Sequence, residues 1–246
     1  MRYFVQLSYQ GTNYHGWQFQ PNAISVQEIL ERTFSTLLQE KTAITGAGRT
    51  DAGVHAKNFI AHFDMDNPIY ENDIQLFIFK LNYMLPADVI IHKIFEVPSD
   101  FHARFDAKSR TYQYIITRTK NPFNIHGAWL RWDELDINLM NEACEILMQY
   151  TDFTSFAKLH TDNKTNDCNL MLAHWKEDNE MYIFEIKANR FLRNMVRSIV
   201  GTMMDVGKQK ISLEQFRAII ESKNRSSAGI SAPAQGLYLM NIEYNL

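Results

Sequence analysis

The segment GAGRTDAGVHA, residues 46–56, combines groups that can do chemistry with very few bulky side chains. It holds the carboxylate of Asp51 and the guanidinium of Arg49, and Val54 is its only large apolar residue. Because glycine lets other groups approach the backbone closely, such a loop could present both charges to a ligand. The alternative is a tight turn in which Asp51 only caps backbone amides, since Gly and Asp are both common in turns.

Two phosphate-binding motifs that glycine-rich loops often form do not fit this segment. A dinucleotide-binding loop reads G-x-G-x-x-G, but Asp51 occupies the position of the third glycine, where a carboxylate would repel a pyrophosphate. A P-loop needs a lysine directly after its last glycine, and the next lysine here is Lys57. What remains is a flexible loop that presents one carboxylate and one guanidinium, with the tight turn as the alternative.

The composition predicts a globular protein without a metal site. Its 246 residues are 46% hydrophobic, which is ample for a core. Eight histidines and two cysteines show neither an HExxH motif nor the spacing of a Cys/His metal site. The start RYFVQLSYQ lacks the apolar stretch of a signal peptide, and no apolar run is long enough to span a membrane. We expect a cytoplasmic protein with reduced thiols.

Positive charge is local in this chain, whose net charge is −3. Residues 102–120 carry six basic or histidine side chains against the single acid Asp106, and residues 190–197 carry three arginines and no acid. Affinity for RNA depends on the phosphates that are neutralised at the binding site, so these clusters favour a nucleic-acid interface. The alternative for each cluster is a solvated surface.

The hydrophobic periodicity predicts alternating strands and helices. We expect strands near 3–9, 42–46, 58–64, 89–97, 111–118, 168–176, 181–188 and 237–244, and helices near 25–38, 71–82, 136–149, 191–206 and 213–222. This order predicts an α+β fold of two ferredoxin-like or RRM-like halves, residues 1–105 and 106–246. The halves would form a continuous mixed, mainly antiparallel sheet, with helices on one face and an RNA-binding cleft on the other.

The segment KSRTYQY predicts a row of basic and aromatic side chains. With a strand period of two, Lys108, Arg110, Tyr112 and Tyr114 point to one side. Such a row suits stacking on bases and pairing with phosphates. The alternative is that both tyrosines pack in the core with their hydroxyl groups hydrogen-bonded.

The helix expected near 191–206 has an apolar stripe and an opposite side that carries Arg197 and Gly201. Gly201 lies one turn from Arg197, so another backbone could pack beside that guanidinium. One hypothesis is that Arg197 pairs with Asp51 and keeps this carboxylate ionised. The alternative is an arginine that only faces solvent.

The chain as a whole resembles the tRNA pseudouridine synthase A family. The similarity is carried, in order, by GTNYHGWQFQ, SVQEILE, GRTDAGVHA, LNYMLPADV, DFHARFDAKSRTYQY, DFTSF, KANRFLRNMVRSIVGTMM and GLYL. The resemblance extends over nearly the whole sequence. One departure is Cys168, which follows Thr165 where the family has a basic residue; Lys158 or Lys164 could replace that contact.

The resemblance implies a uridine isomerase that acts on positions 38, 39 and 40 of the tRNA anticodon arm. Asp51 matches the catalytic aspartate, Arg49 an arginine that helps to extrude the base, Tyr112 an active-site tyrosine and Arg197 the partner of the aspartate. The resemblance also implies a homodimer that needs no metal or cofactor. Further substrate-binding or supporting residues are expected in the first basic cluster: His102, Arg104 and Arg110.

The chemistry explains these residue types, although it leaves the route open. Asp51 could attack C1′ of the sugar or C6 of the base, or act as a base at C2′. The target must leave its stack, and Val54, Phe105 and Leu239 are candidates for the walls around it. The remaining alternatives are a non-catalytic RNA-binding protein, an enzyme for another RNA, and a glycoside hydrolase. A retaining hydrolase needs a second nearby carboxylate, for which Asp64 and Asp66 are the nearest candidates in sequence.

Overall fold

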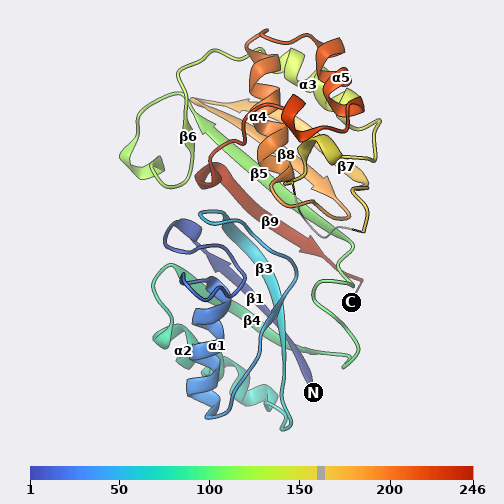
Figure 1. The fold of residues 1–246 in the computed structure, drawn as a ribbon. Helices are drawn as coiled ribbons and strands as arrows, with labels where there is room; N and C mark the ends of the chain where they lie inside the picture. Colours follow the sequence, from blue (N-terminus) through green and yellow to red (C-terminus); the bar gives the residue numbers. More distant parts are fainter. Residues whose placement is uncertain (160–163, 246) are drawn as a thin grey trace. The chain divides into compact units, whose positions relative to one another are not determined.

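A computed structural model describes residues 1–159 and 164–245 of the chain (Figure 1). The fold is α+β, and the described residues form five α-helices and nine mostly antiparallel strands. They divide into two compact units. The first unit comprises Met1–Lys108 together with the segment from Leu239, and the second comprises Ser109–Tyr238. None of the described helices is long and apolar enough to cross a membrane.

The first unit is a sheet covered on one face by two helices. Its elements are β1 (Arg2–Tyr9), α1 (Val26–Leu38), β2 (Thr45–Gly46), β3 (His55–Asp64), α2 (Glu71–Met84) and β4 (Val89–Val97). Strand β1 lies between β4 and β3 and is antiparallel to both, and β9 (Leu237–Glu243) follows β3. Phe34 of α1 packs against Phe63 of β3 and Phe77 of α2, with ring centroids 5.0 and 5.9 Å apart. These contacts place both helices on one side of the sheet.

The opposite face of this sheet has a cluster of aromatic rings at one end. Phe4 is fully buried and lies within 6.3 Å of the rings of His62, Phe95, Phe101 and Tyr244. Phe4 and Tyr3 are neighbours in a strand and therefore point to opposite faces. The sheet is thus buried on both faces at this end, which agrees with the mostly apolar sequence of β1.

The second unit is built in the same way from later elements. They are β5 (Ser109–Thr117), β6 (Trp129–Leu130), α3 (Ile137–Leu147), β7 (Leu170–Asp178), β8 (Met181–Ala188), α4 (Met195–Gly207) and α5 (Leu213–Glu221). Strand β8 lies between β5 and β7 and is antiparallel to both, whereas β6 pairs with β5 in parallel. Trp175 stacks on Phe184 at 4.9 Å, and its indole nitrogen lies 3.2 Å from the sulfur of Met203 in α4. The sheet of this unit is therefore packed against α4.

The helix starts follow from local capping chemistry. Ser25 accepts a hydrogen bond from the Glu28 amide at 3.2 Å and so caps the first turn of α1. Helix α4 begins at Met195, four residues later than its apolar stripe predicts, because Asn194 adopts a left-handed conformation with φ of 66°. An isolated residue in this conformation interrupts a right-handed helix.

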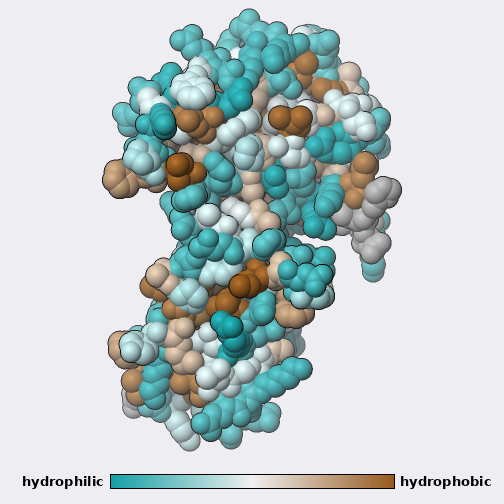
Figure 2. All heavy atoms as spheres, turned by 60° about the vertical axis from the view of Figure 1, so that its left-hand side comes forward, coloured by the Kyte–Doolittle hydropathy of each residue, from teal (hydrophilic) through white to brown (hydrophobic). Residues whose placement is uncertain are grey.

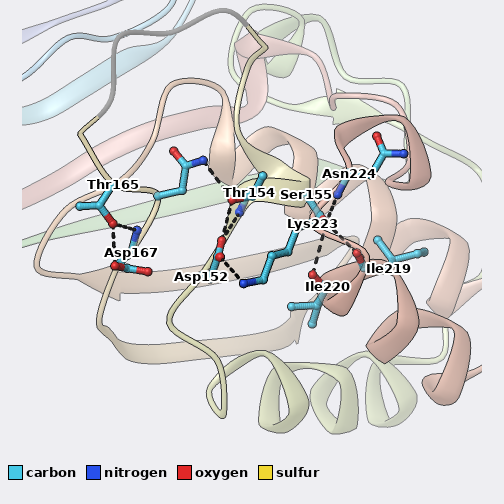
Figure 3. A network of polar contacts seen from close by, with 10 residues as sticks. Asp152, Thr154, Ser155, Thr165, Asp167, Ile219, Ile220, Lys223 and Asn224 are labelled. Atoms are coloured by element: carbon cyan, nitrogen blue, oxygen red, sulfur yellow. Dashed lines mark hydrogen bonds and ion pairs between the residues drawn. The ribbon is translucent and has the colours of Figure 1, made fainter.

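The DFTSF motif is a structural junction of the second unit (Figure 3). Asp152 accepts hydrogen bonds from the amide and hydroxyl groups of Thr154, at 3.0 and 2.6 Å, and pairs with Lys223 at 2.9 Å. The buried Ser155 hydroxyl donates to the Ile219 carbonyl at 2.7 Å and accepts from the Asn224 amide at 3.0 Å. The motif thereby ties its short helix to the end of α5.

Candidate active site

The loop of residues 47–54, which carries Asp51, joins β2 to β3 and is held by the chain segment after β1. The Trp17 amide donates to the Thr50 carbonyl at 3.3 Å, and the Gly53 amide donates to the Tyr14 carbonyl at 3.2 Å. The Tyr9 hydroxyl lies 2.9 Å from the Thr50 hydroxyl, and both residues are buried. Backbone and side-chain bonds on both sides of Asp51 therefore fix its position.

Two glycines allow the supporting segment to come this close. A side chain on Gly11 would overlap the Val54 carbonyl, and one on Gly16 would overlap the Thr50 carbonyl. Gly16 also has φ of +86°, which other residues rarely adopt. The GTNYHGW motif is thus needed for its backbone as much as for its aromatic rings.

The two charged side chains of the loop are accessible. Asp51 is half-buried and Arg49 is exposed, whereas their neighbour Thr50 is buried. The Asp51 carbonyl accepts from the Val54 amide at 3.2 Å, so the segment is also a turn. Gly48 has open space where a side chain would lie. The loop thus combines both readings of the sequence: it turns tightly, and it presents a carboxylate and a guanidinium.

His55 has a structural place that its sequence motif did not reveal. It is 2% exposed, and its Nδ1 accepts a hydrogen bond from the Gly11 amide at 3.0 Å. Accepting at Nδ1 requires the tautomer that carries its proton on Nε2. The histidine therefore secures the supporting segment to the start of β3.

The predicted residues His102 and Arg104 lie in a second loop of the first unit, residues 99–106. The His102 amide donates to the Asp106 carboxylate at 2.6 Å, and its ring nitrogen accepts from the Arg104 amide at 3.0 Å. Arg104 is exposed, and its guanidinium lies 5.6 Å from the ring of Phe105. Phe105 is 75% exposed and so is not part of an enclosed wall.

His62 anchors this second loop, a role that its local sequence does not indicate. It is 5% exposed, and its Nδ1 accepts from the Ala103 amide at 3.2 Å. Burial and, to a smaller extent, the nearby charges of Arg2 and His102 lower the pKa of His62 from 6.5 to about 4, against the opposite effect of Asp64. His62 is therefore a neutral hydrogen-bond acceptor near pH 7.

Tyr112, Arg110 and Arg197 belong to the second unit. Tyr112 is half-buried, with its ring 5.2 Å from that of Phe191, and Arg110 donates to the Asn189 carbonyl at 2.7 Å. Arg197 is half-buried, and its Nε donates to the Ala232 carbonyl at 2.7 Å. These three side chains are thus anchored near the start of α4.

The prediction of a basic and aromatic row along β5 is wrong at Tyr114. This residue is fully buried, and its hydroxyl donates to the Pro233 carbonyl at 2.7 Å. Burial also raises its pKa above the ordinary value. Tyr114 is paired in register with Phe184, on the sheet face that packs against α4. Its alternative reading as a core tyrosine with a bonded hydroxyl is the correct one.

The close packing expected at Gly201 is confirmed. A side chain at this position would overlap the Ile230 carbonyl, and the Ala232 amide donates to the Arg197 carbonyl at 3.0 Å. The segment around residues 230–232 therefore packs on α4 beside Arg197, and it supplies the carbonyl that holds the guanidinium.

Cys168 does not face solvent, so it is not a direct substitute for a basic RNA contact. It is 2% exposed, and burial raises the pKa of its thiol to about 11. Among the residues outside 160–163 and 246, no three His, Cys, Asp or Glu side chains gather as a group that could hold a metal ion.

Sequence comparison identifies the family to which this fold and site belong. The family model described as tRNA pseudouridine synthase matches residues 7–106 and 143–245, which include both loops and every predicted site residue except Arg110 and Tyr112. The chain belongs to the tRNA pseudouridine synthase family. It is therefore a pseudouridine synthase, an isomerase that acts in tRNA modification.

Curated relatives extend this match over nearly the whole chain. A protein of Bacteroides fragilis named tRNA pseudouridine synthase A is 52% identical over 245 residues, covering 99% of this chain and 96% of the relative. A protein of the same name from Parabacteroides distasonis is 48% identical over 243 residues, with the same coverage. One from Acetivibrio thermocellus is 40% identical over 97% of both chains. The resemblance drawn from the motifs is thereby confirmed.

Proposed function

We propose that this enzyme converts uridines 38, 39 and 40 of the tRNA anticodon arm to pseudouridine, with Asp51 as the essential carboxylate. The observation that carries the proposal is the 47–54 loop. Backbone bonds to Tyr14 and Trp17 hold it on either side of Asp51, while the positions around Asp51 are bare of large side chains. A rigid support is what a catalytic carboxylate requires, and the open space above Gly48 suits a nucleotide laid against the loop.

The reaction exchanges one bond of the base for another. The bond between C1′ and N1 breaks and a bond between C1′ and C5 forms, while C5 loses a proton and N1 gains one. Asp51 serves as a nucleophile at C1′ or C6 or as a base at C2′, and in each route it reacts as the carboxylate. No co-reactant is needed, because the product is an isomer of the substrate.

The other predicted residues are assigned supporting roles. Arg49, which is exposed beside Asp51, fills the gap left by the extruded base. Arg197 pairs with Asp51 and favours its ionised form, and Tyr112 packs against the target base. Support for the last two comes from their fixed positions: the Ala232 carbonyl holds Arg197, and Phe191 lies against Tyr112. His102, Arg104 and Arg110 would contact the RNA backbone.

We further propose that the enzyme is a cytoplasmic homodimer that binds its RNA in a cleft. Support for the dimer comes from the exposed apolar face of α2. The inner residues of this helix, Ile78 and Leu81, are buried. Its outward residues Leu76, Phe79 and Tyr83 are 52%, 66% and 84% exposed. Spacings of three and four place these outward residues on one stripe. Figure 2 shows hydrophobic side chains at the protein surface among hydrophilic ones.

Tritium release from tRNA labelled at C5 of uridine tests the reaction directly. Wild type should release tritium without added metal, and Asp51→Asn should release none while binding tRNA as before, because the change removes a charge and little volume. Asp66→Asn is the matched control, since Asp66 is an exposed carboxylate outside the loop. It should keep full activity.

The products of the reaction distinguish the proposed function from the alternatives. Free uracil in place of pseudouridine would identify a glycoside hydrolase, and tRNA binding without any release by wild type would identify a non-catalytic RNA-binding protein. Activity retained by Asp51→Asn would contradict the assignment of the carboxylate. Mapping the modified nucleotides settles which uridines are targets.

A further inference from the structure

The exposed ring of Phe105 is an exception in a loop that is otherwise well anchored. The Ala103 carbonyl accepts from the Tyr244 hydroxyl at 2.5 Å, and the Phe101 carbonyl accepts from Arg2 at 3.2 Å. The Ala103 amide also donates to His62 and the His102 amide to Asp106, so these contacts fix the loop on β1, on β3, on the residue after β9 and at its own end. The ring is therefore held in solvent by a rigid backbone.

The surroundings of the ring suit a nucleobase. The ring of His102 lies 4.3 Å from that of Phe105, and the Arg104 guanidinium lies 5.6 Å from it. An aromatic face beside an arginine is the combination that proteins use to stack unpaired bases and to hold the adjoining phosphate. With 75% of Phe105 exposed, most of the ring surface is open to such a base.

The ring of Phe105 lies away from the Asp51 loop, where the uridine is proposed to react. His62, which supports the loop, and His55, next to the Asp51 loop, are seven residues apart in β3. At the rise of a strand, that spacing is on the order of 20 Å. A base on Phe105 is therefore a different nucleotide from the one that reacts at Asp51.

We propose that Phe105, with Arg104 and His102, forms a platform on which an unpaired base of the substrate RNA stacks, away from the reacting uridine. The proposal rests on the proposed function, because the RNA is its substrate. Stacking of one base on an aromatic side chain changes affinity by about 5- to 150-fold. The platform would contribute to the grip on the tRNA and not to the isomerisation step.

The test compares Phe105→Ala and Phe105→Trp with wild type in filter binding to an unmodified tRNA transcript. Phe105→Ala should weaken binding within the range above, and the slope of affinity against salt should stay that of wild type, because a phenyl ring neutralises no phosphate. Phe105→Trp should bind like wild type. With enzyme in excess and saturating, the rate of tritium release should be equal in all three. Phe123→Ala, which removes a ring that is 93% exposed in the second unit, is the matched control and should bind like wild type.

The outcomes distinguish this proposal from the function on which it rests. Wild type that neither binds nor modifies tRNA would overturn the proposed function. Normal modification by wild type with unchanged binding by Phe105→Ala would overturn the platform alone. Equal weakening by Ala and Trp, or a lower mass in solution for Phe105→Ala by light scattering, would assign the ring to packing or to contact between chains.

Discussion

Acid should weaken this protein through one buried histidine, His62. Its pKa is about 4 in the folded protein and 6.5 when the ring is free in solution. Between these values the unfolded chain binds the proton and the folded protein does not. The contribution is therefore fully present above about pH 6.5 and is lost as the pH falls toward 4. The cause is structural, since a protonated Nδ1 can no longer accept from the Ala103 amide.

The size of the effect follows from the two pKa values. Lowering the pH from 7.5 to 5 should cost about 2 kcal/mol of the free energy of unfolding. Replacing His62 by Asn retains an acceptor for the Ala103 amide and removes the titrating group. The variant should lose less stability than wild type over the same pH range.

Urea denaturation at pH 7.5 and pH 5.0, at equal ionic strength and followed by circular dichroism, measures this difference. His174→Gln, at an exposed position on β7, controls for the loss of an imidazole. If wild type and His62→Asn lose the same free energy between the two pH values, then His62 is not the responsible group and the reasoning from its burial is refuted.

Three further predictions concern the segment that supports the Asp51 loop, the loop itself and the outer face of α2. Gly16→Ala should lower stability by at least about 1 kcal/mol in thermal unfolding, because Gly16 has a positive φ and an added side chain would overlap the Thr50 carbonyl. Gly48→Ala, which meets open space, should unfold like wild type but lower kcat/KM by roughly tenfold if a nucleotide lies against the loop; full activity would exclude that placement. Phe79→Glu should reduce the mass seen by light scattering from a dimer to a monomer, and an unchanged dimer would show that this stripe is not the interface.

Periodicity and local motifs predicted the elements well, because both are properties of neighbouring residues. The strand 89–97 and the strand 181–188 have the expected limits. The close packing at Gly201 was also predictable, because a glycine one turn from Arg197 leaves room for another backbone. The start predicted for α4 was wrong. Apolar residues continue on both sides of Asn194, but the left-handed conformation of this residue interrupts the helix.

Such patterns could not predict contacts between residues that are far apart in the sequence. A strand period of two places Tyr112 and Tyr114 on one side, but it does not reveal that α4 packs on that side and buries Tyr114. His62 and Ala103 are 41 residues apart, and nothing in either local sequence indicates their hydrogen bond. The candidate catalytic residues were found through the family motifs, whereas the residues that position them needed the structure.

The place of β9 has a consequence for how the protein folds during synthesis. The first unit needs the segment from Leu239, where Asn241 accepts from Asn58 at 2.7 Å and Tyr244 donates to Ala103. The ribosome makes that segment after all of the second unit, which is continuous from Ser109 to Tyr238. Domains generally fold as units once their residues are available. The second unit can therefore fold before the first is complete, and the unit that carries Asp51 waits for the last strand.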